Sequence, residues 1–110
     1  MSLPLRVAFA GTPEFAVSAL NAIHQSGHQI EVVICQPDRP AGRGRKTQAC
    51  AVKQQAVELE LPVYQPERLS SQEGLIHLNQ YSPDVLVVVA YGQLLSRQVL
   101  EIPRLGCFNI

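Results

Sequence analysis

The hydrophobic residues of this chain gather into short runs that alternate with segments of helical spacing. Five runs are apolar, partly β-branched and bounded by turn residues, and they predict strands over residues 5–10, 30–35, 63–64, 85–90 and 107–110. Between them, apolar residues recur every three or four positions and predict helices over residues 13–26, 51–61, 70–81 and 96–101. The run at 85–90 is apolar throughout, as a central parallel strand must be.

Strands that alternate with helices predict an α/β fold with a parallel sheet, because right-handed crossovers place helices on both faces. We expect a Rossmann-like, doubly wound sheet with the strand order 3-2-1-4-5, truncated after its fifth strand. In that order the first and fourth strands are neighbours where the winding reverses. The turns Gly11-Thr12-Pro13 and Tyr91-Gly92 should therefore flank one crevice.

The first turn has the residues of a helix start. Thr12 can serve as an N-cap, with Pro13 at the first helical position, and free amides there can cradle an anion. A structural turn is the simpler interpretation. The turn lacks GxGxxG, and Cys35-Gln36 stands where a dinucleotide-binding fold carries an acid, so a dinucleotide site is disfavoured.

Composition excludes several classes of protein. The 110 residues carry nine basic and nine acidic side chains, so no global field draws the chain to nucleic acid or to a membrane. Three widely spaced cysteines without CxxC argue against a disulfide framework or a zinc site. The first apolar run is too short for a signal peptide or a membrane span. We expect a cytoplasmic protein without a metal.

One segment departs from this neutrality. The stretch 38–46 holds four of the nine basic residues, namely Arg39, Arg43, Arg45 and Lys46, against the single acid Asp38. Its prolines and glycines predict an irregular loop. Cations concentrated on such an arm favour phosphate binding, and the alternative is a solvated charge run.

The last strand ends with a polar side chain. Asn109 stands where strand ends face the crevice, and its amide can donate a hydrogen bond to a developing oxyanion or satisfy nearby backbone. It cannot act as a base. His24, His28 and His77 are expected on the surface or at the edge of the core, and no Ser-His-Asp set or metal-ligand cluster is evident.

Four segments together are more specific than any one of them. Residues 10–16 (AGTPEFA), 36–46 (QPDRPAGRGRK), 87–92 (VVVAYG) and 105–110 (LGCFNI) closely resemble the N-terminal part of bacterial methionyl-tRNA formyltransferases. The first and last segments also suit related folate-dependent enzymes such as glycinamide ribonucleotide transformylase. The arginine-rich segment is typical of the tRNA enzymes.

The resemblance implies transfer of a formyl group from 10-formyltetrahydrofolate to the amino group of methionine on initiator tRNA. It implies that Asn109 is the first of three catalytic polar residues and that Arg39, Arg43, Arg45 and Lys46 contact RNA. We assign folate binding to the turn formed by Tyr91, Gly92, Gln93 and Leu94.

The resemblance also sets expectations for the whole molecule. Residues 1–110 would be the N-terminal part of a formyltransferase catalytic domain, with no second domain, and the full-length enzyme would be monomeric. The partner His and Asp, a Ser-Leu-Leu-Pro folate segment and an RNA-binding domain would follow Ile110. The chain alone is then expected to be inactive and, with an unpaired edge strand, prone to associate.

Two other functions remain open from the residues alone. One is a non-catalytic Rossmann-type module, for which binding of a reduced folate against a dinucleotide discriminates. The other is RNA binding through residues 38–46 alone, which requires a steep dependence of affinity on salt.

Overall fold

A five-stranded parallel sheet organises the molecule. The computed structural model describes residues 3–41, 44 and 46–110. The sheet contains β1 (Arg6–Gly11), β2 (Gln29–Ile34), β5 (Val63–Tyr64), β6 (Val85–Val89) and β7 (Cys107–Asn109), in the order β5-β2-β1-β6-β7. This confirms the expected 3-2-1-4-5, once two additional strands outside the sheet are left out of the numbering.

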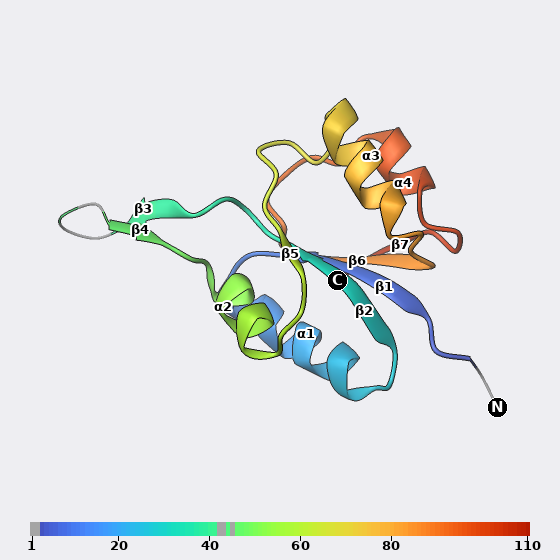
Figure 1. The fold of residues 1–110 in the computed structure, drawn as a ribbon, viewed down its shortest axis with the longest axis horizontal. Helices are drawn as coiled ribbons and strands as arrows, with labels where there is room; N and C mark the ends of the chain where they lie inside the picture. Colours follow the sequence, from blue (N-terminus) through green and yellow to red (C-terminus); the bar gives the residue numbers. More distant parts are fainter. Residues whose placement is uncertain (1–2, 42–43, 45) are drawn as a thin grey trace.

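Two layers of helices cover the sheet (Figure 1). On one face lie α1 (Glu14–Gln25) and α2 (Ala51–Glu58), and on the other lie α3 (Gln72–Gln80) and α4 (Arg97–Glu101). No helix in the described part of the chain is long and apolar enough to cross a membrane.

Alternate residues of the strands build two separate cores, because successive strand side chains point to opposite faces. On β1, Ala8 and Ala10 pack with Leu69, Leu78 and other residues on the α3 and α4 side. Phe9, between them, packs with Ala16 and Leu20 of α1 on the other side. Both cores are apolar, since the buried residues in the described part of the chain include no charged side chain.

The first glycine turn depends on close packing. A Cβ atom on Gly11 would lie 2.9 Å from the carbonyl oxygen of Val89 and 3.1 Å from the Cβ of Ala16. Glycine therefore lets β1, β6 and the start of α1 meet at this edge of the sheet.

The expectation of an irregular loop at 38–46 was wrong. Arg39–Ala41 (β3) and Lys46–Gln48 (β4) form an antiparallel hairpin that projects from the domain at one end of its longest dimension (Figure 1). Pro40 pairs with Thr47. A two-stranded ribbon tolerates proline, because each strand has one free edge to which the missing N–H can face.

The expected N-cap at Thr12 was also wrong. Pro13 occupies the cap position of α1 without a side-chain hydrogen bond, and the helix begins at Glu14. The hydroxyl of Thr12 instead donates to the carbonyl oxygen of Tyr91, 2.8 Å away. Ser71, Cys50 and Ser96 do cap α3, α2 and α4 with their side chains.

Asp84 fixes the entry into β6. Its carboxylate accepts hydrogen bonds from the backbone N–H of Arg6 at 2.9 Å and from Nε of Arg104 at 3.1 Å. These bonds favour the charged form and lower the pKa of Asp84 from its ordinary value of 3.8.

An acid-stability prediction follows from this direction. Just below pH 3.8 the Asp84 carboxylate is protonated in the unfolded chain but still charged in the folded chain. The stabilisation by Asp84 is therefore complete above that pH and is lost as pH falls through the lower pKa of the folded state. Asp84→Asn should therefore be less stable than wild type near neutrality, and the difference should shrink as pH falls below 3.8. Chemical denaturation across that range measures it. A difference that grows in acid would contradict the assignment.

Candidate active site

The carboxyl ends of all five parallel strands meet at one edge of the sheet. A cavity of about 250 Å³ lies there between the turn after β1, the exit of β2 and the root of the hairpin. It is lined by Thr12, Gln36, Pro37, Arg39, Gln48, Ala49 and Cys50. A second cavity, of about 320 Å³, lies beside the segment after β6 and is lined by Glu67, Arg68, Ser70, Gln93 and Leu94. Ligands of open α/β sheets bind at this edge.

The turn after β6 is held in an unusual backbone conformation. Ala90 has φ 50 and Gly92 has φ 97, both in the left-handed region. The Thr12 hydroxyl holds the carbonyl of Tyr91, and Nε2 of Gln36 donates to the carbonyl of Gly92 at 3.0 Å. A Cβ on Gly92 would lie 2.9 Å from Nε2 of Gln36, which is the movable end of a side chain, so it is mainly the backbone angle that favours glycine here.

Gln93 ties the same turn to its surroundings. Its Nε2 donates to Oε1 of Gln36 at 2.9 Å and to the carbonyls of Pro66 and Glu67 at 3.1 and 3.0 Å. Its Oε1 accepts from the N–H of Leu69 at 2.9 Å. The amide of Gln93 is thus fully engaged within the protein.

Tyr91 is part of the core. Its side chain is 1% exposed, and its hydroxyl has no hydrogen-bond partner in the described parts of the chain. Burial, followed by the nearby Cys35 thiol, raises the pKa of Tyr91. Of the four residues assigned to folate binding, Tyr91 and Gln93 therefore shape the turn, while Leu94 is 97% exposed.

The unpartnered hydroxyl leads to a stability prediction. Tyr91→Phe should raise the free energy of unfolding by about 1 kcal/mol, because it removes a buried polar group that makes no hydrogen bond. Denaturant titration of wild type and variant measures the change. A loss of stability would reveal a partner for the hydroxyl and contradict this account.

Asn109 lies on β7, the edge strand of the described sheet. Its Cα pairs with that of Val88, and Val88 pairs in turn with Ala10, so Asn109 stands level with the next-to-last residues of β1 and β6. It is exposed, and Phe108 and Ile110 beside it are 56% and 73% exposed. Asn109 therefore lies at the edge of the sheet where ligands of open α/β folds bind.

The structure describes only part of the basic segment. The Arg39 side chain is 61% exposed and lies 4.0 Å from Glu67, and Lys46 begins β4. Arg43 and Arg45 lie outside the described residues. The described strands β3 and β4 project from the domain beside α2 (Figure 1).

Sequence reasoning missed a chain of polar contacts beneath the hairpin. Nε2 of Gln65 donates to the carbonyl of Gln36 at 3.1 Å and to the Asp38 carboxylate at 2.7 Å. Nζ of Lys53 donates to the other oxygen of Asp38 at 2.7 Å. The available signal was that Gln36 and Asp38 directly follow a buried strand, where side chains reach the working edge.

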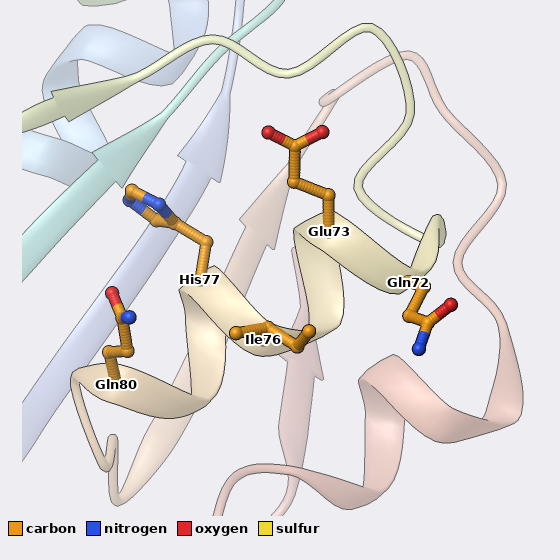
Figure 2. Close-up of a pocket in the computed structure, with 5 residues that line it drawn as sticks. All are labelled: Gln72, Glu73, Ile76, His77 and Gln80. Carbon is orange, nitrogen blue, oxygen red and sulfur yellow. The ribbon is translucent and has the colours of Figure 1, made fainter.

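A surface hollow larger than these two cavities lies elsewhere, on α3 (Figure 2). It measures about 520 Å³ and is lined by Gln72, Glu73, Ile76, His77 and Gln80.

The His77 ring stacks on Tyr64 at a centroid distance of 3.7 Å, and its Nε2 lies 3.2 Å from the Tyr81 hydroxyl. Nδ1 of His28 accepts from the N–H of Leu5 at 2.9 Å. These two histidines make structural contacts, in agreement with the expectation.

The three cysteines are free thiols. Cys35 is buried, which raises its pKa to about 12, whereas Cys50 and Cys107 are partly buried. Among the residues that the structure describes, no three His, Cys, Asp or Glu side chains form a group that could hold a metal ion.

Known proteins resemble this chain over nearly its whole length. The chain is 55% identical over 106 residues to a methionyl-tRNA formyltransferase of Legionella pneumophila (strain Corby). The match covers 96% of this chain and 34% of that protein. The chain is also 51% identical over all 110 residues to the corresponding enzyme of Pseudoalteromonas translucida. The chain thus spans about a third of the length of these curated relatives.

A solved structure supports the fold. Glycinamide ribonucleotide transformylase 1 from Geobacillus kaustophilus superposes with a TM-score of 0.63 at 19% identity, covering 98% of this chain and 57% of that one. The sequence model described as formyl transferase matches residues 5–110. Because that match takes in every strand of the sheet, the turns after β1 and β6, and the hairpin, the chain belongs to the formyl transferase family.

Proposed function

We propose that residues 1–110 form the N-terminal part of the catalytic domain of an enzyme that formylates the methionine carried by initiator tRNA. The formyl donor is 10-formyltetrahydrofolate. The observation that carries this proposal is that two relatives named methionyl-tRNA formyltransferase match 96% and 100% of the chain at 55% and 51% identity. The cations of the hairpin segment suit an acceptor with many phosphates, such as RNA, whereas a small acceptor would not need them.

Asn109 is the proposed catalytic residue. Attack of an amine on a formyl carbon places negative charge on the carbonyl oxygen, and a donor aimed at that oxygen lowers the barrier. The exposed amide of Asn109, level with the ends of β1 and β6, is suited to this role. An amide does not titrate, so the base that takes the proton from the amine must be another group.

The turn of Tyr91, Gly92, Gln93 and Leu94 is the proposed donor site. Its conformation is fixed from within by Thr12, Gln36 and the core, so a ligand meets a preformed surface. 10-Formyltetrahydrofolate supplies the one-carbon unit that is transferred. The chain contributes the backbone of this turn and the exposed side chain of Leu94, while Tyr91 and Gln93 hold the turn in place.

The hairpin is the proposed RNA contact. Arg39 and Lys46 belong to the two strands of the hairpin, and Arg43 and Arg45 come between them in the sequence of a chain with no net charge. Phosphate contacts of this kind supply affinity and orientation for nucleic acids. In this arrangement the hairpin reaches the acceptor tRNA, and the crevice beside its root receives the methionyl end.

A transfer assay on the full-length protein tests the proposal. Labelled 10-formyltetrahydrofolate and initiator methionyl-tRNA should yield N-formylmethionine after hydrolysis of the ester, and heat-denatured protein should yield none. Folate binding without transfer would instead support a non-catalytic module. RNA binding with a steep salt dependence and no transfer would support a protein that works through residues 38–46 alone.

A further inference from the structure

The root of the hairpin is anchored by one carboxylate. Asp38 lies between the end of β2 and the first residue of β3, and both of its oxygens are engaged. Oδ1 accepts from Nε2 of Gln65 at 2.7 Å, and Oδ2 accepts from Nζ of Lys53 at 2.7 Å. Gln65 follows β5 and Lys53 belongs to α2, so the carboxylate is held by two different elements of the domain.

This anchor differs from the other ion pair of the hairpin. The side chains of Lys53 and Asp38 are 25% and 29% exposed, and their contact is short. Arg39 and Glu67 are 61% and 77% exposed and 4.0 Å apart, which is typical of a surface pair that contributes little. Hydrogen bonds from Lys53 and Gln65 lower the pKa of Asp38, so the carboxylate is charged at neutral pH.

The anchor matters because contacts at the root of the hairpin must fix its direction. Among the described residues, β3 and β4 pair with each other, outside the five-stranded sheet. Gln65 also donates to the carbonyl of Gln36, so one side chain holds the outgoing segment at two points. The returning segment enters α2, where Cys50 Sγ accepts from the N–H of Lys53. Lys53 thus stands between the two legs of the hairpin.

We propose that Asp38 is a positioning residue, which fixes the direction in which the hairpin leaves the domain and so determines where its cations meet the phosphates of the acceptor RNA. This inference rests on the proposed function. Asp38 is the one acid of the basic segment 38–46, and from its charge alone it would be expected to oppose RNA binding. A carboxylate beside RNA-binding cations should weaken binding, yet here it makes their placement possible.

The direction in which Asp38→Asn changes the tRNA affinity of the full-length protein tests this inference. The substitution removes one negative charge from the RNA-binding segment, so electrostatics alone predict tighter tRNA binding. Loss of the anchor predicts the reverse, because asparagine turns an uncharged amide toward the Lys53 ammonium. We expect the Kd for initiator methionyl-tRNA to rise about fivefold to tenfold and the KM for 10-formyltetrahydrofolate to stay within about twofold.

Glu67→Gln is the matched control. It makes the same change of charge beside the same hairpin, at an exposed side chain whose contact with Arg39 is a loose one of 4.0 Å. Its Kd for tRNA should equal that of wild type or fall. Lys53→Met removes the anchor from the other side. Its effect and that of Asp38→Asn should not add in the double variant, because both break one interaction.

The outcomes separate the two claims. If wild type binds tRNA and transfers formyl groups while Asp38→Asn binds tRNA as tightly as Glu67→Gln, the anchoring role is overturned and the proposed function stands. If wild type neither binds tRNA nor transfers formyl groups, both are overturned. If Asp38→Asn fails to fold, the result for Lys53→Met decides: unchanged tRNA affinity in that variant overturns the anchor.

Discussion

Replacing Asn109 with alanine in the full-length protein should lower turnover by about a hundredfold or more, which corresponds to about 3 kcal/mol in the activation barrier. The reason is that Asn109 is proposed to donate a hydrogen bond to an oxygen that becomes charged only as the amine attacks. Within the described residues β7 is held by backbone pairing with β6, and the Asn109 side chain makes no hydrogen bond there, so the fold should lose little. Turnover at saturating substrates and the free energy of unfolding measure the two effects separately.

Asn79→Ala is a suitable control for this substitution. Asn79 is also an exposed asparagine, but it lies on α3, away from the ends of the strands. Its turnover should equal that of wild type. Turnover of Asn109→Ala within about threefold of wild type would show that the amide has no part in stabilising the transition state.

The second large effect concerns the hairpin. Replacing Arg43 and Arg45 together with alanine should weaken tRNA binding and reduce the slope of log affinity against log salt by about two phosphate contacts. The KM for 10-formyltetrahydrofolate should not change, because the turn after β6 is held by Thr12, Gln36 and the core. Binding isotherms at several salt concentrations provide the measurement.

Arg97→Ala controls for charge alone. Arg97 is 90% exposed and pairs only with Glu101 of the same helix, and α4 lies on the face of the sheet opposite α1 and α2. Its salt dependence should match that of wild type. If the double arginine variant also keeps the wild-type slope, the cations of the hairpin are merely solvated.

Much of the fold was predictable because its determinants are local. The all-apolar run at 85–90 identified the central strand β6, and the glycine turns marked where strands end. Right-handed crossovers then left few possible strand orders. The short strand at 63–64 was recognisable from its place after Pro62, and the structure contains it with the same bounds.

The hairpin was missed because its stability depends on pairing that composition does not reveal. Prolines and glycines argue against regular structure in general, but each of two paired strands still has one free edge. Thr12 was assigned to capping for a similar reason. Its hydroxyl bonds to Tyr91, 79 residues away, and local sequence carries no information about such a partner.

The sequence predicted that the candidate residues lie at the ends of the strands, but it did not predict what each side chain does there. Strand ends indicated where Asn109 and the turn at 91–94 would lie. Sequence could not distinguish side chains that face a ligand from those that hold the turn, as Tyr91 and Gln93 do. Nor could it relate Asp38 to Lys53 and Gln65, since these contacts depend on how α2 and β5 pack beside the hairpin.

The choice of acceptor by the full-length protein tests the central claim most directly. Labelled 10-formyltetrahydrofolate is offered together with equal concentrations of initiator methionyl-tRNA and glycinamide ribonucleotide, and the label is followed into each. The account predicts that the label appears as N-formylmethionine on the tRNA and not on the ribonucleotide. Label on the ribonucleotide, or on neither acceptor, would contradict it.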